Sequence, residues 1–241
     1  MKHNKKVDMI VDLQFGSTGK GLLAGYLATT RNYDVCVTAN MPNAGHTFID
    51  ANGNKMIHKV LPNGVVGKSV GWALIGPGAV FCPRRLNAER ETLRSFGYGH
   101  FSVAIHPNAI MLKPAHREAE GNMGRIGSTM QGSAEAMIEK IHRPEYPVTV
   151  GQRGHPLAVS AEMYDEILQE ATSVLAEGAQ GFSLGINQRF YPYCTSRECT
   201  PSRFLSDMAI PHALLRTTIG TARVHPIRPG RGRDRGARGS A

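Results

Sequence analysis

Residues 15–21 read Phe-Gly-Ser-Thr-Gly-Lys-Gly and directly follow an apolar run from Val7 to Leu13. We predict that the run is a strand, that the glycine-rich stretch is a turn, and that a helix follows from Leu22 to Thr30. Glycines let backbone N–H groups approach phosphate oxygens, and the N-terminus of a helix adds partial positive charge. The stretch is therefore a candidate phosphate-binding loop, with an ordinary turn between a strand and a helix as the alternative.

The loop does not have the spacing of a Walker A motif. That motif places four residues between its first glycine and its Gly-Lys pair, whereas two residues separate Gly16 from Gly19 here. Lys20 would still supply a full positive charge. If the loop binds phosphate, its candidate residues are Gly16, Ser17, Thr18, Gly19, Lys20 and Gly21.

Three further segments combine glycine or proline with polar side chains. Asn43-Ala44-Gly45-His46-Thr47 follows the apolar run Tyr33 to Val37, and Glu177-Gly178-Ala179-Gln180-Gly181 follows the run Ser173 to Leu175. The third segment, residues 191–196, reads Tyr-Pro-Tyr-Cys-Thr-Ser. Ligands of parallel sheets bind beyond the carboxyl ends of the strands. We therefore expect the loops at Gly16, Asn43 and Glu177 to meet at one edge of a sheet.

The remaining elements alternate between strands and helices. Asn52-Gly53 lies between two alternating runs and predicts a hairpin over Thr47 to Val60. We predict two more strands, Gly71 to Ile75 and Phe101 to Ile105. The predicted helices cover Pro83 to Phe96, Lys113 to Gly121, Gln131 to His142, Ala161 to Ala171 and Pro201 to Leu214. The expected fold class is α/β, with a largely parallel central sheet, flanking helices and a hairpin.

In their order, these motifs resemble those of the adenylosuccinate synthetase family. Its members carry G-D-E-G-K-G-K, N-A-G-H-T, I-G-T-T-G, E-G-A-Q-G and Y-P-Y-V-T-S, and the third of these corresponds to Ile126-Gly127-Ser128-Thr129 here. The match extends over about residues 7 to 225. The resemblance implies a fold related to P-loop NTPases and a C–N bond-forming ligase that requires Mg²⁺. A triphosphate would phosphorylate the 6-oxo group of a purine nucleotide, and the amino group of L-aspartate would then displace the phosphate.

The first loop departs from the family pattern at three positions. Ser17, Thr18 and Leu22 stand where the family has Asp, Glu and a second Lys. The serine resembles the phage-type branch of the family, which uses dGMP rather than IMP, with ATP or dATP as the energy donor. Guanine carries an amino group next to N1, and a small hydroxyl leaves room for it and can accept its hydrogen bond. The alternatives are a synthetase that still uses IMP and one that has lost its catalytic base.

The resemblance implies roles for individual residues. His46 corresponds to the general acid, Gln180 donates to the purine 6-oxo group, and Ser17 replaces the catalytic base. The ATP phosphates would contact residues 16–21. The substrate nucleotide would contact Asn43, Ser128, Thr129, Arg143, Gln180 and Thr195.

The resemblance also implies a metal site and a dimer. The Mg²⁺ ligands would be the backbone carbonyl of Gly45 and the hydroxyl of Ser17. Arg143 would reach across the interface of a homodimer to the substrate phosphate of the partner. Without the resemblance, His46 is a surface histidine, Gln180 and the threonines are turn caps, and Arg143 is a solvated helix end.

Composition favours a soluble intracellular protein. No apolar run approaches the about 18 residues of a membrane span, and no signal-peptide core follows the basic residues 1–6. We expect a cytoplasmic protein, in the host cytoplasm if a phage encodes it, with no membrane partner. The four cysteines and ten histidines lack metal-binding spacing, which predicts buried thiols, no disulfide framework and no transition-metal site.

The positive charge is concentrated at the C-terminus. Residues 223–241 contain six arginines and one aspartate and contribute +5 of the formal +9. We predict a nucleotide-binding α/β domain over 1–222, an incomplete synthetase core, and a disordered Arg/Gly-rich tail over 223–241. The tail indicates a truncation or a change of reading frame, since no stretch matches the aspartate-binding and base-reading elements of the family. A nucleotide-binding fragment without turnover, and a nucleic-acid binder that acts through the tail, are the remaining alternatives.

Overall fold

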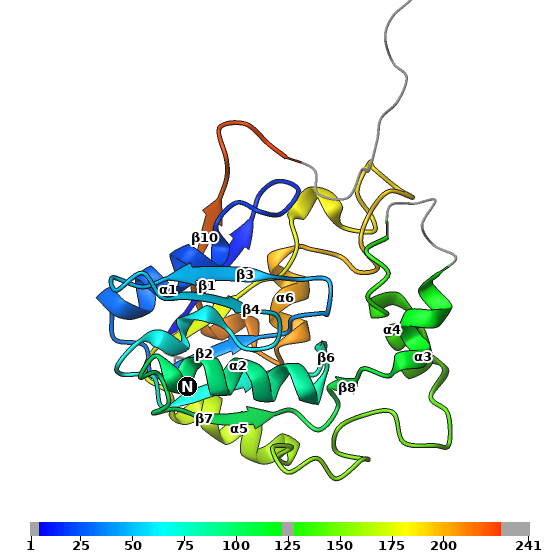
Figure 1. Ribbon diagram of the computed structural model, residues 1–241, viewed down its shortest axis with the longest axis horizontal. Coiled ribbons are helices and arrows are strands. Elements are labelled where there is room, and N and C mark those ends of the chain that lie inside the picture. Colours follow the sequence, from blue (N-terminus) through cyan, green and yellow to red (C-terminus); the bar gives the residue numbers. More distant parts are fainter. Residues whose placement is uncertain (1–4, 122–127, 228–241) are drawn as a thin grey trace, which may run out of the picture.

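The computed structural model describes residues 5–121 and 128–227 (Figure 1). The predictions made for Ile126, Gly127 and most of the Arg/Gly-rich tail fall on residues outside these ranges. No helix within the described residues is long and apolar enough to span a bilayer.

A sheet of six parallel strands forms the centre of the fold. Its strand order is β10-β1-β9-β2-β5-β7. The apolar runs predicted as strands all occur here, and the prediction of a largely parallel α/β sheet is confirmed. Every residue of β1, β2 and β9 is buried, as expected for parallel strands covered on both faces. The bounds are β1 Val7–Asp12, β2 Val35–Thr38, β5 Trp72–Ile75, β7 Ser102–Ile105, β9 Val174–Glu177 and β10 Leu215–Thr221.

Helices and two small strand pairs surround this sheet. The hairpin is formed by β3 (His46–Ile49) and β4 (Lys55–His58), as predicted from Asn52-Gly53. A parallel pair, β6 (Val80–Phe81) and β8 (Ile110–Met111), was not expected. The α-helices are α1 Lys20–Thr30, α2 Pro83–Ser95, α3 Pro114–Ala119, α4 Ser133–His142, α5 Ala161–Glu170 and α6 Pro201–Asp207; the 3₁₀ turns are η1 Asn63–Val66, η3 Phe182–Leu184 and η4 His212–Leu214.

The apolar core has a main part and a smaller part. The main core packs the sheet against α1, η1, the hairpin, α5 and α6. The smaller core lies under α4, which stands with α3 to one side of the sheet in Figure 1. It consists of Met41, Val80, Ile110, Leu112, Ala136 and Val148. Because Met41 belongs to the loop after β2, that loop and α4 share the smaller core.

The C-terminal helix prediction was wrong beyond Asp207. The helix α6 ends there, Ala209 adopts a left-handed conformation (φ 55°), and Pro211 cannot continue a helix. The chain then forms η4 and enters β10, a strand that the sequence reasoning missed. β10 is the edge strand beside β1, and most of its residues are partly or fully exposed, so it lacks the apolar run that marks the central strands.

The cysteine prediction holds for two of the four residues. Cys36 and Cys199 are buried, whereas Cys82 and Cys194 are half-buried. Burial raises the pKa of the Cys199 thiol to about 12, so this thiol stays protonated and unreactive at neutral pH.

Candidate active site

The three motif loops emerge side by side from the sheet. Glu177, the last residue of β9, is in register with Ile10 of β1 and with Thr38 of β2. The carboxyl ends of β1, β9 and β2 are therefore neighbours. The prediction that the loops at Gly16, Asn43 and Glu177 meet at one edge is confirmed.

The loop between β1 and α1 is organised around the carboxylate of Asp12. The backbone N–H groups of Gln14 and Gly16 donate to Asp12 Oδ1 at 2.8 and 3.2 Å. The Thr18 hydroxyl donates to Asp12 Oδ2, and Lys20 Nζ approaches the same oxygen at 3.2 Å. Asp12 and Lys20 are both buried. Two residues of the candidate phosphate loop thus converge with backbone donors on one internal anion.

The charge state of Asp12 follows from these contacts. Burial by itself would raise its pKa, but the Lys20 ammonium and the hydrogen bonds from Thr18 and Gln14 outweigh burial and lower the pKa below its usual value. The carboxylate is therefore ionised at neutral pH.

The helix begins at Lys20 rather than at Leu22 as predicted, so Lys20 and Gly21 lie in the first turn of α1.

Lys20 also connects the loop after β1 to the loop after β9. Its ammonium donates to the backbone carbonyl of Gln180 at 2.7 Å. Gln180 is in a left-handed conformation (φ 66°), and a Cβ at the next residue, Gly181, would collide with the backbone nitrogen of Gly16. The close approach of the two loops therefore requires glycine at position 181.

Three of the residues expected to hold the substrate nucleotide are linked by hydrogen bonds. Gln180 Nε2 donates to Asn43 Oδ1 at 3.0 Å, and Asn43 Nδ2 donates to Thr195 Oγ1 at 3.5 Å. This chain of three side chains links the loop after β9, the loop after β2 and the segment before α6. Each side chain carries hydrogen-bonding groups that a nucleotide can use.

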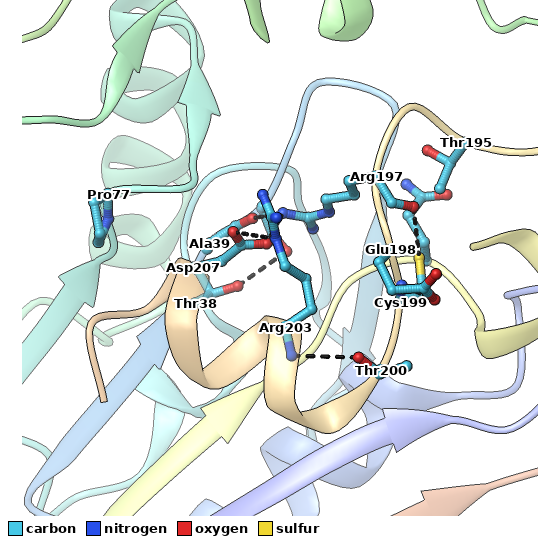
Figure 2. A network of polar contacts seen from close by, with 12 residues as sticks. Thr38, Ala39, Pro77, Thr195, Arg197, Glu198, Cys199, Thr200, Arg203 and Asp207 are labelled. Atoms are coloured by element: carbon cyan, nitrogen blue, oxygen red, sulfur yellow. Dashed lines mark hydrogen bonds and ion pairs between the residues drawn. The ribbon is translucent and has the colours of Figure 1, made fainter. Parts of the chain in front are cut away.

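A buried ion pair holds two of these segments together. Figure 2 shows Arg197 and Arg203 converging on Asp207 of α6. Arg197 Nη1 donates to Asp207 Oδ2 at 3.2 Å and to the carbonyl of Ala39 at 2.9 Å, while Arg203 Nε donates to Asp207 Oδ1 at 2.8 Å. Burial raises the pKa of Asp207, an effect that the two arginines offset in part. Arg197 thereby anchors the Thr195 segment to the loop that carries Asn43.

His46 is paired with a buried carboxylate. The residue begins β3, and its Nδ1 lies 2.6 Å from Glu177 Oε1. The other oxygen of Glu177 accepts the backbone N–H of Asn63 at 2.6 Å. His58 faces His46 across the hairpin and is also buried.

Other predicted site residues stand apart from this group. Ser17 (φ 56°) and Gly45 are exposed, each in a motif loop. Ser128 accepts the backbone N–H of Met130 at 3.1 Å, and the carbonyl of the exposed Thr129 accepts from Gln131 Nε2. Arg143 is exposed at the C-terminus of α4 with φ 51°. No hydrogen bond or ion pair links these last three residues to Asn43, Gln180 or Thr195 within the described part of the chain.

Sequence reasoning missed three polar residues that build the site: Asp12, Glu177 as a partner of His46, and Arg197. A signal existed for two of them, because Asp12 and Glu177 end apolar runs at the carboxyl edge of a sheet, where polar residues are commonly functional. Nothing local marked Arg197, since its partner Asp207 and the Ala39 carbonyl are assembled only by the fold.

Comparison with known proteins agrees with this geometry. The family "Adenylosuccinate synthetase" matches residues 9–151 and 149–234. The chain belongs to the adenylosuccinate synthetase family. Within that family it is 50% identical over 236 residues to the N6-succino-2-amino-2'-deoxyadenylate synthase of Vibrio phage phiVC8, covering 94% of this chain and 69% of the relative.

Two solved structures share the fold. The succinoaminodeoxyadenylate synthetase of Cyanophage S-2L, bound to dGMP and to dATP as an energy donor, superposes with a TM-score of 0.85 at 35% identity and covers 92% of this chain and 65% of its own. The fully ligated adenylosuccinate synthetase of Plasmodium falciparum has a TM-score of 0.78 at 21% identity, covers 95% of this chain and 64% of its own, and supports the fold alone. The chain therefore spans about two thirds of the length of the relatives it matches.

Proposed function

We propose that this chain carries the activity of an N6-succino-2-amino-2'-deoxyadenylate synthase. It would join L-aspartate to the 6-position of dGMP with ATP or dATP as the phosphoryl donor. The γ-phosphoryl group would be transferred to O6 of guanine, and the aspartate amino group would then attack C6 and release phosphate. The observation that carries the proposal is Ser17 in a phosphate-type loop that contacts the Gln180–Asn43–Thr195 group through Lys20.

The residues on this edge of the sheet suit that reaction. Lys20 and the backbone N–H groups at the start of α1 favour an anion such as the triphosphate. The Gln180 amide can donate to O6 as charge develops there, and Nε2 of His46 is free to serve the transferring phosphoryl group because the ring is held through Nδ1. Ser17 leaves space for the 2-amino group of guanine where an aspartate side chain would crowd it.

The exposed oxygens of Gly45 and Ser17 fit a magnesium ion. Mg²⁺ prefers oxygen ligands and is commonly held by few protein groups together with substrate phosphates. The Asp12 carboxylate does not suit this role, because Thr18, Lys20 and two backbone N–H groups already occupy it. A bound Mg²⁺ would neutralise negative charge on the triphosphate. The Gly45 carbonyl and the Ser17 hydroxyl would hold it.

We further propose that the chain works as a homodimer. The exposed position of Arg143 at the end of α4 suits a residue that reaches the substrate phosphate in a partner subunit. Ser128 and Thr129 precede α4 in the chain and would contact the substrate nucleotide. Since phages encode the similar synthases, the reaction would take place in the cytoplasm of an infected host.

Substitution Ser17→Asp tests the specificity argument. We expect the ratio of the dissociation constants for dGMP and IMP, measured by isothermal titration calorimetry, to rise by about 10-fold or more, because the carboxylate crowds the 2-amino group. Ser17→Ala serves as the control, since it keeps the space and should keep the preference for dGMP. An unchanged ratio in Ser17→Asp would show that Ser17 does not determine the preference for dGMP over IMP.

A nucleotide-binding protein without turnover is the second candidate. The observation in its favour is that the Lys20 ammonium of the phosphate-type loop is already engaged by Asp12 and by the Gln180 carbonyl. This candidate predicts that dGMP binds and that no succinylated product forms.

A further inference from the structure

Glu177 is the most deeply buried carboxylate at the carboxyl edge of the sheet. Its residue exposure is 0%, and its side chain contacts the His46 ring with one oxygen and the Asn63 backbone N–H with the other. A charge in such a position is costly unless its hydrogen bonds are satisfied. Both oxygens are satisfied here, and both partners lie close to the start of α1.

These contacts determine which nitrogen of His46 carries a proton. A carboxylate can only accept hydrogen bonds, so the short 2.6 Å contact requires a proton on Nδ1. In the neutral ring, Nε2 is then the nitrogen with the free lone pair. The Asn63 N–H fixes the carboxylate from behind, since it is a backbone group of η1 and cannot rotate away.

The surroundings leave the His46 ring little freedom. A Cβ at Gly21 would collide with the Asn63 side chain and lie 2.8 Å from His46 Cβ, so the first turn of α1, η1 and the start of β3 are in close contact. His58 lies opposite His46 in the hairpin register, and burial lowers its pKa to about 4. His58 is thus neutral at physiological pH, so it does not compete with His46 as a cationic partner of Glu177.

We propose that Glu177 is the positioning residue of His46: it holds the ring through Nδ1–H and orients Nε2, which donates a hydrogen bond to the phosphoryl group being transferred when the ring is doubly protonated. This inference rests on the proposed function for the role of Nε2, whereas the tautomer and orientation of the ring belong to the protein itself. The Asn63 backbone N–H and Glu177 together form the support of the ring.

The test is ¹⁵N NMR of the histidine side chains in the substitution Glu177→Gln, recorded at about pH 8, above the ordinary imidazole pKa of about 6.5. To keep the Asn63 hydrogen bond, the new amide must turn its oxygen to Asn63 and its NH₂ group to His46 Nδ1. The ring should therefore change from the Nδ1–H to the Nε2–H tautomer, visible as an exchange of the two ring-nitrogen shifts. Loss of the His46 signals in His46→Gln assigns the resonances.

Glu89→Gln is the matched control. Glu89 is a buried glutamate that likewise accepts backbone N–H groups, those of Lys59 and Leu61, without touching His46. It should leave the His46 tautomer unchanged even if it lowers stability. An unchanged tautomer in Glu177→Gln, or an equal change in Glu89→Gln, would overturn the proposal.

Kinetics supply a second readout. In Glu177→Gln we expect kcat for dGMP to fall about 100-fold while KM changes by less than about threefold, because the ring acts on the transferring group and does not hold the nucleotide. A tautomer change together with an unchanged kcat would show that Glu177 positions His46 but that His46 is not catalytic. That result would contradict the proposed function without affecting the structural part of the inference.

Discussion

Substitution Asp12→Ala is expected to lower the free energy of unfolding by about 3 to 5 kcal/mol, measured by denaturant unfolding. It removes the only carboxylate that pairs with the buried Lys20 ammonium among the described residues, and an unpaired buried charge is costly. It also leaves the Gln14 and Gly16 N–H groups without their acceptor. The loop and the start of α1 should lose their order together.

The double substitution Asp12→Ala with Lys20→Met is the control for this prediction. Methionine keeps most of the volume of the lysine stem and removes its charge, so the double variant should recover about 1 to 2 kcal/mol relative to Asp12→Ala. If the double variant is as unstable as the sum of the single variants, the ion pair is not the source of the effect.

His58 is expected to make the protein less stable as the pH falls from about 6.5 to about 4. Burial lowers the pKa of His58 to about 4 in the folded state, and the nearby charge of Glu177 offsets burial only in part. In the unfolded state its pKa is about 6.5, so the unfolded chain binds one more proton within this window. The free energy of unfolding should therefore fall by about 3 kcal/mol on this account when the pH reaches the folded-state pKa.

The substitution His58→Gln isolates this contribution. The pKa of His106 and that of His155 are also lowered by burial, but they contribute equally in both proteins and cancel in the difference. The unfolding free energy of the variant, measured by chemical denaturation from about pH 7 to pH 4, should depend less on pH. A variant that follows the wild-type curve in parallel would show that His58 does not titrate as described.

The central part of the fold was predictable from the sequence because its strands are short apolar runs followed by glycine-containing loops. β1, β2 and β9 are buried on both faces, so their sequences carry an unambiguous signal. Strands that are less buried carry fewer apolar residues, so their sequences predict them less clearly. β10 at the edge alternates little and was missed, and so was the end of α6 at Asp207, after which Ala209 is left-handed and Pro211 follows.

The candidate site was less predictable from the sequence than the central sheet. The motifs identified the loops, and the parallel sheet required three of them to converge, so Gln180 and Asn43 were expected near one another before their contact was seen. The supporting interactions were not predictable: Asp12 with Lys20 and Arg197 with Asp207 are paired by the path of irregular loops, and Glu177 with His46 by long-range folding. The roles of Ser128, Thr129 and Arg143 stay predictions.

The measurement that tests the central claim most directly is a mass-spectrometric assay of the purified chain with L-aspartate, dATP and Mg²⁺, in which dGMP and IMP are offered in parallel. We expect a succinylated nucleotide from dGMP and none from IMP. Product from IMP alone would contradict the assignment of Ser17 and the choice of substrate. No product from either nucleotide, while dGMP still binds, would contradict the ligase activity and leave a nucleotide-binding protein.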